Sequence, residues 1–336
     1  MSSFNSISIN RRTLLAGAAA TSALAAASSA AQEGVLSARP DMRGKSVLIT
    51  GCSSGFGRLG AEHYARLGAK VFATMRNLPR PEAEELTALA AREGLDIHVI
   101  EIDVTDDAQV TAGVAEAERI NGGGLDVLVN NAGVGITGPV EVQDMEATRL
   151  AFDTNVLGYH RLVRAVLPGM RAKKAGQIFM ISSQLGRVIV PGGGHYSATK
   201  FAIEALGEQL AYELVPHNIE VTIIQPGGYP TEIWRNRNQY NTALKERAEG
   251  IHTAGYPQMV ARMGTEDGSG RSADPMDVPG AIAEIVAMPP GTRPLRRAVH
   301  PGGKPQLPIN ETSARVQVGW LGETPLGPWI KAVHNV

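Results

Sequence analysis

Residues 46–57 read SVLITGCSSGFG, an apolar run of strand length that passes directly into a turn with three glycines. Glycine lets a backbone approach a phosphate closely, and the amides at the start of a following helix can bind a pyrophosphate. The glycines are separated by three residues and then by one, which differs from the common dinucleotide-binding spacing. The turn alone is equally consistent with a tight loop, so its interpretation depends on the rest of the chain.

Short apolar runs alternate with helix-length segments from Gly44 onward, a pattern typical of βαβ units and a parallel sheet. The predicted strands are residues 46–50, 71–75, 97–102, 127–130, 177–182 and 220–224, with a weaker seventh at 297–300. The predicted helices include residues 81–93, 108–120, 145–172 and 197–215. Such a series predicts an α/β fold with a Rossmann-type doubly wound parallel sheet.

The chain of 336 residues is predicted to form a single large domain with a C-terminal lid and tail. The Rossmann-type domain is assigned to residues 44–290, and within it the polar, glycine-rich stretch 228–275 is assigned to a substrate lid. Residues 291–336 contain many prolines and glycines and no evident amphipathic helix. We expect this C-terminal extension to wrap or pair rather than fold alone.

The N-terminal residues have the order of an export signal. Arg11 and Arg12 precede a largely apolar stretch at 14–27 and small residues at 28–31. The run SINRRTLL at 8–15 resembles a twin-arginine signal, which exports folded proteins. We therefore predict a signal peptide at 1–31, a linker at 32–43 and a periplasmic or otherwise exported protein. An alanine-rich leader or a misassigned start would instead leave the protein in the cytoplasm.

Composition narrows the classes of partner. A net charge of −1 gives no basic field for nucleic acid, so no nucleic-acid partner is expected. The apolar N-terminal stretch is too short for a permanent membrane anchor. Cys52 is the single cysteine, which excludes an intramolecular disulfide, and no cysteine and histidine cluster has metal-ligand spacing. No metal site is predicted.

Tyr196 and Lys200 carry the predicted chemistry. They stand four residues apart at the start of a helical pattern, which places both side chains on one face. A free tyrosine has a pKa near 10, and an adjacent cation is expected to lower it, making the pair a usable acid and base. Ser183 ends the fifth strand, where a hydroxyl can hydrogen-bond a substrate oxygen. His195, beside Tyr196, is interpreted as a loop residue rather than a second base.

At these residues the chain resembles the short-chain dehydrogenase/reductase (SDR) family. The resemblance covers about residues 44–231 and rests on the glycine turn at 50–57, the segment NNAG at 130–133 and the spacing of Ser183, Tyr196 and Lys200. It implies a catalytic tetrad that adds Asn155, with Asn155 ordering a proton-relay water and Lys200 also holding the nicotinamide ribose. Ser182 is not chosen, because the family spacing falls on Ser183.

The resemblance also implies contacts with a dinucleotide cofactor. It assigns Asp103 to the adenine ring, Asn131 to stabilising the sheet, and Pro226, Gly227 and Thr231 to the nicotinamide carboxamide. A cap for Asp103 and a plain Pro-Gly turn remain the alternatives. The implied cofactor-binding residues are Gly51, Ser53, Ser54, Gly55, Phe56, Gly57, Arg76, Asp103, Val104, Asn131, Ala132, Gly133, Tyr196, Lys200, Pro226, Gly227 and Thr231.

The end of the second strand indicates which cofactor is preferred. An acidic residue there would bind the ribose hydroxyls of NAD and repel a 2′-phosphate. Met75 stands at that position and Arg76 follows with a guanidinium suited to phosphate. Arg58, next to the glycine turn, could contribute or be solvated. We predict a preference for NADP(H), with NAD(H) as the alternative.

These observations predict an NADP(H)-dependent oxidoreductase that interconverts an alcohol and a ketone or aldehyde, with Tyr196 as the general acid and base. The expected substrate is an apolar small molecule, because Trp234, Tyr240 and Tyr256 suggest an aromatic cover, although they could simply pack the lid. The glycine turn at 50–57 also resembles that of the subgroup handling steroids and retinoids, which implies a steroid-, retinoid- or small-carbonyl-like compound. An NAD-linked alcohol dehydrogenase and a non-catalytic dinucleotide-sensing protein remain alternatives. A homodimer or homotetramer is expected.

Overall fold

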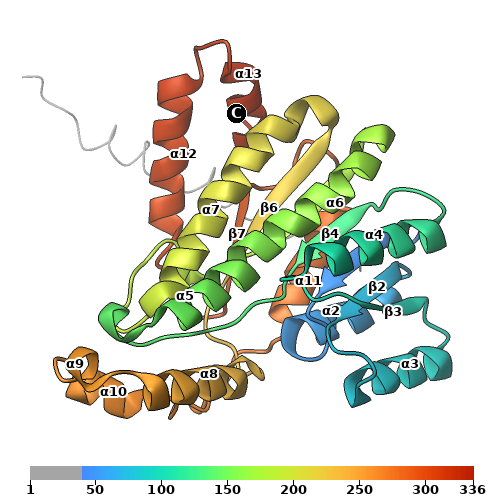
Figure 1. The fold of residues 1–336 in the computed structure, drawn as a ribbon. Helices are drawn as coiled ribbons and strands as arrows, with labels where there is room; N and C mark the ends of the chain where they lie inside the picture. Colours follow the sequence, from blue (N-terminus) through green and yellow to red (C-terminus); the bar gives the residue numbers. More distant parts are fainter. Residues whose placement is uncertain (1–39) are drawn as a thin grey trace, which may run out of the picture. The chain divides into compact units, whose positions relative to one another are not determined.

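The structure, a computed structural model, describes residues 40–336, and its strands form one seven-stranded parallel sheet (Figure 1). The strand order is β3-β2-β1-β4-β5-β6-β7. Because helices cover both faces, the central strands are largely apolar, and all five residues of β1 are buried. The strands are β1 (Ser46–Thr50), β2 (Lys70–Met75), β3 (Ile97–Glu101), β4 (Val127–Asn130), β5 (Gly176–Ile181), β6 (Ile219–Pro226) and β7 (Arg296–Val299).

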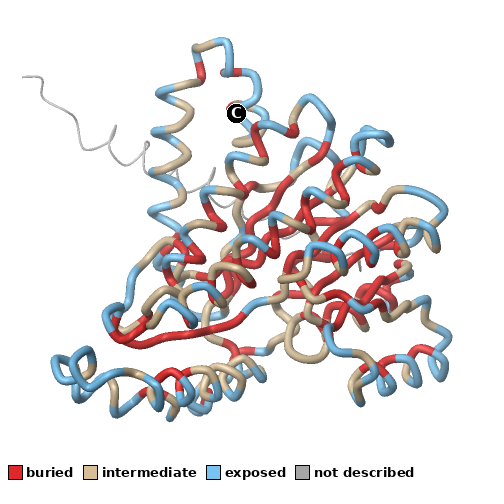
Figure 2. The backbone as a smooth tube through the Cα atoms, in the orientation of Figure 1, coloured by how far each residue is buried: buried red, intermediate tan, exposed pale blue. Residues whose placement is uncertain are grey.

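The sheet confirms the predicted Rossmann-type fold, and the predicted strand ends differ from the observed ones by no more than two residues. Helices α2 (Gly55–Arg66), α3 (Pro81–Glu93) and α11 (Asp277–Ala287) share one hydrophobic core with one face of the sheet. Helices α4 (Asp107–Asn121), α6 (Gly158–Lys173) and α7 (Gly194–Leu214) share a second core with the other face. Buried residues accordingly run through the middle of the unit in Figure 2.

The helix predicted at 145–172 is interrupted. The structure has α5 (Met145–Phe152), a π-helical segment (Asp153–Leu157) and then α6. Such π-bulges occur frequently at functional sites. The segment contains Asn155, whose side chain is completely buried.

The predicted lid is largely helical. It contains α8 (Ile233–Arg247), α9 (Gly250–Thr253) and α10 (Pro257–Arg262). Leu244 and Met263 pack in a third small core with residues of the loop after β4 and of α5, including Ile136 and Ala147. The lid is therefore attached to the segment that follows β4.

The C-terminal extension, in which the sequence shows no evident amphipathic helix, is helical in the structure. Helices α12 (Leu307–Leu321) and α13 (Gly327–His334) form there. Each has a proline in its first turn, Pro308 and Pro328, where the missing amide would have no helical partner in any case. No residue of α12 is buried, and its apolar side chains, including Leu307, Val316 and Trp320, are exposed.

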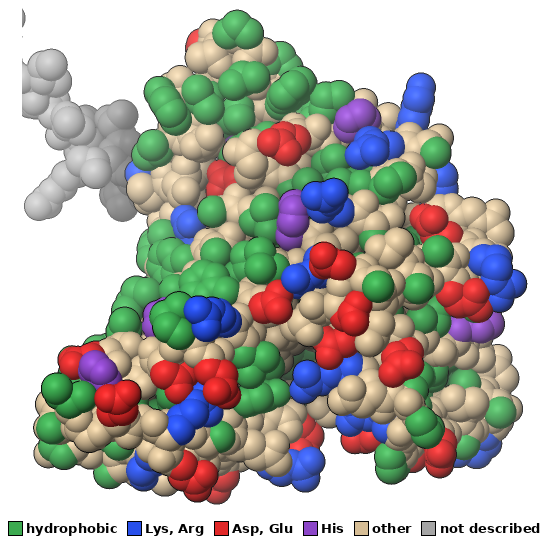
Figure 3. Space-filling view, viewed as in Figure 1, with side chains coloured by type: hydrophobic (Ala, Val, Ile, Leu, Met, Phe, Trp, Pro, Cys, Tyr) green, Lys and Arg blue, Asp and Glu red, His purple; other side chains and the backbone are tan. Residues whose placement is uncertain are grey.

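The predicted signal peptide, residues 1–31, and most of the predicted linker lie outside the described residues. Among residues 40–336, none of the helices combines the length and the apolar character needed to cross a membrane. On the face shown in Figure 3, cationic and anionic side chains are interspersed rather than gathered by sign, as the net charge of −1 would suggest.

Candidate active site

The glycine turn between β1 and α2 leaves no room for a side chain at Gly57. Gly51 has a φ of +75°, and a Cβ on Gly57 would lie 2.2 Å from the carbonyl oxygen of Gly51. Ser54, the N-cap of α2, makes no side-chain hydrogen bond to the helix amides. The start of α2 therefore keeps amides available for an anionic ligand.

Thr50 joins this turn to the segment after β4. The Asn131 Nδ2 donates to the Thr50 carbonyl oxygen at 2.7 Å. The Thr50 hydroxyl accepts from the backbone amides of Asn131 at 3.0 Å and Ala132 at 2.9 Å. These bonds fix Ala132 and Gly133 beside the glycine turn, and the Asn131 side chain stabilises the β1–β4 edge.

The segment after β6 reaches the same turn. A Cβ on Gly55 would lie 3.6 Å from the Cβ of Thr231, so the threonine packs directly against the turn. The Gly227 amide donates to the Val299 carbonyl at 3.0 Å, which holds the chain just beyond Pro226 against β7. The structure thus brings together three predicted cofactor-binding segments that are far apart in the sequence.

Met75 does not occupy the position expected of it. Its side chain is 2% exposed and packs in the core, so it cannot stand in for a ribose-binding acid. Arg76 is the residue that extends from this strand end, with a side chain 45% exposed. Its Nη1 lies 3.9 Å from Asp103 Oδ2, and its Nη2 donates to the Tyr240 hydroxyl at 3.3 Å. Of the two residues that the sequence singles out at this strand end, Met75 is buried and Arg76 is accessible.

Two neighbouring side chains have structural partners. Asp103 Oδ1 accepts from the Thr105 amide at 2.9 Å and from the Thr105 hydroxyl at 2.7 Å, so it caps the turn before α4. Val104 is buried beside it. Arg58 pairs with Glu62 at 2.7 Å, which leaves Arg76 as the freer cation near this end of the sheet.

Helix α7 carries the predicted acid-base pair. The Lys200 Nζ lies 5.5 Å from the centroid of the Tyr196 ring and donates to the Ile181 carbonyl at 2.9 Å. The Lys200 side chain is thus held between its own helix and the end of β5. The expected proximity of the two residues is present in the structure.

Burial dominates the acid-base properties of the pair. It lowers the pKa of Lys200 to about 8, against the opposing charge of Glu204. It also raises the pKa of the Tyr196 phenol, while the Ser183 hydroxyl and the Arg237 charge act in the opposite direction. The expectation that a neighbouring cation gives Tyr196 a lowered pKa is therefore wrong for this structure, because desolvation outweighs the favourable charges.

Ser183 lies two residues after the end of β5 and is 8% exposed. Its hydroxyl oxygen accepts from the Leu185 amide at 3.1 Å, which orients the side chain, and it acts on the pKa of Tyr196. Ser182 is buried instead, and its hydroxyl lies against Gly186. A Cβ on Gly186 would be 2.5 Å from the Ser182 Oγ. The geometry favours Ser183 over its neighbour, as the spacing predicts.

Asn155 links three parts of the site. Its Oδ1 accepts from the Val134 amide at 2.8 Å, and its Nδ2 donates to the Val134 carbonyl at 2.9 Å and to the Thr199 hydroxyl at 3.1 Å. Thr199 in turn donates to the carbonyl of Tyr196 at 2.7 Å. The side chain therefore connects the loop after β4 to the helical turn that carries Tyr196.

Arg237 is a site residue that sequence reasoning missed. It lies on α8, and its charge acts on the phenol of Tyr196. Its Nε donates to the Thr137 hydroxyl at 3.0 Å, a contact across 100 residues of sequence. No motif or spacing in the chain signals this contact.

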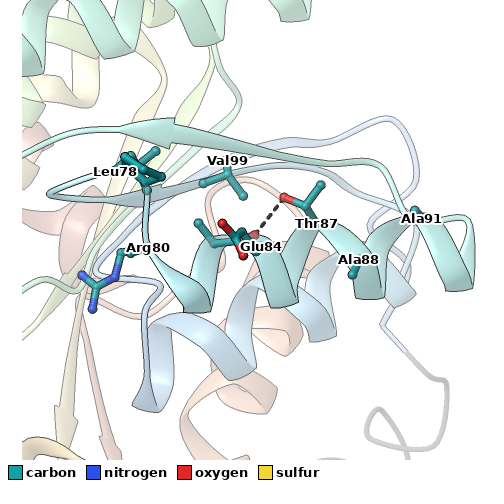
Figure 4. Close-up of a pocket in the computed structure, with 9 residues that line it drawn as sticks. Leu78, Arg80, Glu84, Thr87, Ala88, Ala91 and Val99 are labelled. Atoms are coloured by element: carbon teal, nitrogen blue, oxygen red, sulfur yellow. Dashed lines mark hydrogen bonds between the residues drawn. The ribbon is translucent and has the colours of Figure 1, made fainter.

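A groove away from these residues lies at one edge of the sheet. It has a volume of about 720 Å³ and lies between α3 and β3, the strand at one edge of the sheet (Figure 4). None of the predicted site residues lines it. The groove is mainly apolar, and its walls include Leu78, Ala83 and Val99.

The comparison with family models decides the classification. The model of the short chain dehydrogenase family matches residues 45–242. The chain belongs to this family. The match contains the glycine turn, the segment at 130–133, the π-helical segment and the Tyr196 and Lys200 pair.

Individual relatives agree with this assignment. Human retinol dehydrogenase 8 is 41% identical over 191 residues, which are 56% of this chain and 60% of that enzyme. A Burkholderia phymatum short-chain dehydrogenase/reductase in complex with NAD has a TM-score of 0.66 and 25% identity, with 85% of this chain and 97% of that chain covered. A serine dehydrogenase complexed with NADP⁺ has a TM-score of 0.61 and 27% identity, with 75% and 93% covered. The chain spans about 60% of the length of the retinol dehydrogenase.

Proposed function

We propose that this protein is an NADP(H)-dependent oxidoreductase that interconverts an alcohol and a ketone or aldehyde. The observation that carries the proposal is the buried pair on α7, in which the Lys200 ammonium lies 5.5 Å from the Tyr196 ring. Ser183 lies two residues after the end of the neighbouring strand β5 and acts on the same phenol. Membership of the short chain dehydrogenase family supports the same reaction class.

The residues fit a dinucleotide. The glycine turn excludes side chains at Gly57, Ser54 leaves the first amides of α2 without a side-chain cap, and Thr231 packs against Gly55. These residues would hold the phosphates and the nicotinamide end, and Lys200 would hold the nicotinamide ribose. When bound, the nicotinamide supplies the group that donates or accepts a hydride.

The chain's own residues would manage the proton and the substrate oxygen. Ser183 and Tyr196 hydrogen-bond that oxygen, and the phenol of Tyr196 gives or takes its proton. The raised pKa of Tyr196 keeps the phenol protonated near neutral pH, as needed for an acid. Asn155 would order a proton-relay water, and its side-chain atoms are themselves bound to Val134 and Thr199.

The cofactor preference rests on Arg76. Its half-exposed guanidinium would pair with the 2′-phosphate of NADP(H), and its ion pair with Asp103 is long, at 3.9 Å. We propose an apolar body for the substrate, in line with the names of relatives such as retinol dehydrogenase 8 and 17-beta-hydroxysteroid dehydrogenase type 1.

A screen of carbonyl compounds and alcohols with the purified protein tests the proposal. Oxidation of NADPH, followed at its own absorbance band, should occur with at least one ketone or aldehyde and should be slower with NADH. Binding of NADPH without turnover of any compound would instead support the dinucleotide-sensing alternative.

We also propose that residues 1–31 form a twin-arginine export signal, supported by Arg11 and Arg12 ahead of the apolar run at 14–27. Changing both arginines to lysine should leave a longer precursor in the cytoplasm. Mass spectrometry of the mature protein tests this, and a mature protein that begins at Met1 would contradict it.

A further inference from the structure

Helix α8 holds a cation close to the predicted acid. The Arg237 side chain is 20% exposed and donates to Thr137. The next residue, Gly138, donates its amide to the carbonyl of Gly192 at 2.8 Å, four residues before Tyr196, and the Arg237 charge acts on the Tyr196 phenol. Thr137 fixes the guanidinium, because its hydroxyl accepts from Arg237 Nε at 3.0 Å and from Asn241 Nδ2 at 2.9 Å. Arg237 is thus a positioned side chain rather than a freely moving surface arginine.

A second arginine lies beside it. The guanidinium carbon of Arg271 is 3.6 Å from the centroid of the Trp234 ring, and that of Arg237 is 5.0 Å from the same centroid. Stacking on an indole positions a guanidinium without using its N–H donors. Arg271 also reaches the segment after β6, since a Cβ on Gly228 would lie 3.0 Å from its Nε.

Neither arginine has a buried carboxylate partner in the described part of the chain. Glu266 is the one carboxylate within 4.0 Å of either guanidinium among residues 40–336, at 3.5 Å from Arg237 and 3.9 Å from Arg271. The Glu266 side chain is 51% exposed, and Asp267, whose charge also acts with Arg271, is exposed as well. Water therefore screens the negative charges that face the two guanidiniums.

Most of the donors are also unused. Within the described part of the chain, Arg237 donates one side-chain hydrogen bond, from Nε, and the guanidinium of Arg271 donates none. Arg237 is largely desolvated, and this burial lowers its pKa. Apart from the 3.5 Å contact of Nη2 with the half-exposed Glu266, the Nη groups of Arg237 have no partner among the described residues, so they can donate to an acceptor on a ligand.

We propose that Arg237, with Arg271 beside it, binds a carboxylate of the substrate, so that the substrates are hydroxy- and keto-carboxylates with an apolar body. A planar carboxylate accepts from both Nη groups of a guanidinium at once and supplies a negative charge. This inference rests on the proposed function, because it places the carboxylate beside the acid that serves the reacting oxygen. It refines the apolar substrate class by adding one anionic group.

The test compares acids with their uncharged esters. The probes are 4-oxopentanoate and 7-oxooctanoate, each with its methyl ester, and binding is followed by the fluorescence of Trp234 in a Trp320→Phe, Trp329→Phe variant. The acids should bind at least about tenfold more tightly than their esters, as charge-assisted hydrogen bonds of ordinary strength require. This comparison requires no change at the site itself.

Variants locate the effect. Arg237→Gln should remove the preference for acid over ester, whereas Arg235→Gln should keep it, because Arg235 lies on the same helix but is 75% exposed and pairs with Glu232. Equal affinity for acid and ester in the unchanged site would overturn the inference. If Arg237→Gln weakens NADPH binding as much as it weakens binding of the acids, the inference is also overturned, since the arginine would then serve the cofactor.

The two proposals fail in different ways. If the esters are reduced by NADPH as readily as the acids, the proposed function stands and the carboxylate site is refuted. If the acids bind with the expected preference and no carbonyl compound is reduced, the carboxylate site stands and the proposed function is refuted.

Discussion

Replacing Asn155 by alanine should destabilise the protein by about 3 kcal/mol. The side chain is completely buried and makes three hydrogen bonds, two to Val134 and one to Thr199. Each contributes about 1 kcal/mol net, and the alanine leaves the Val134 amide without its acceptor in the interior. Because Thr199 also bonds the Tyr196 carbonyl, the loss should loosen the first turns of α7 as well.

Urea unfolding followed by circular dichroism measures this change, provided that the slope of the transition stays constant. Asn121→Ala is the matched control, since Asn121 also donates two side-chain hydrogen bonds, to Gly123 and Gly124, but at the protein surface. We expect the control to lose less than about 1 kcal/mol. A loss below about 1 kcal/mol for Asn155→Ala would refute the idea that this residue ties the site together.

Three further changes test the acid-base pair, the cofactor site and the turn. Burial lowers the pKa of Lys200 to about 8, so the unfolded chain binds more protons than the folded chain above that pH. The unfolding free energy should therefore rise from pH 8 to pH 10, and Lys200→Met should abolish this rise in urea titrations. Arg76→Gln should weaken NADPH binding by roughly tenfold to a hundredfold and leave NADH nearly unchanged in direct binding assays; equal losses would favour the NAD-linked alternative. Gly57→Ala should cost at least about 2 kcal/mol in thermal unfolding, because its Cβ would lie 2.2 Å from the Gly51 carbonyl.

The sheet could be predicted because its strands are buried on both faces. Residues such as Val47, Leu48 and Ile49 form an unbroken apolar run, and all three are at most 1% exposed. Helix α3 could also be predicted, from the helical spacing of its apolar residues and from Pro81 at its start. Helices α12 and α13 could not, because Pro308 and Pro328 suggest interruption when each in fact stands in a first turn.

The site was predictable only where its residues follow a local pattern. Tyr196 and Lys200 are one helical turn apart, so their proximity follows from the sequence. The π-helical segment could not be predicted, because residues 145–172 keep helical spacing throughout. The interruption accompanies a hydrogen bond between Asn155 and Val134, which is far from it in the sequence. Arg237 reaches the site through Thr137, 100 residues away, which only the folded chain brings close.

The exposure of strand ends was a further limit. Met75 and Arg76 are adjacent in the sequence at the end of β2. The sequence does not show how far each side chain is exposed there. The structure buries Met75 in the core and leaves Arg76 accessible. Substituting Met75 would therefore disturb packing rather than report on the cofactor.

The turnover of Tyr196→Phe tests the central claim most directly. The change removes one hydroxyl and keeps the ring that packs beside Lys200, so folding and NADPH binding should stay nearly unchanged. Because general acid-base catalysis supplies roughly 10² to 10⁴ in rate, kcat for a carbonyl substrate should fall by at least about a hundredfold. A variant that binds NADPH normally and retains half of the wild-type kcat would contradict the assignment of Tyr196 as the acid and base.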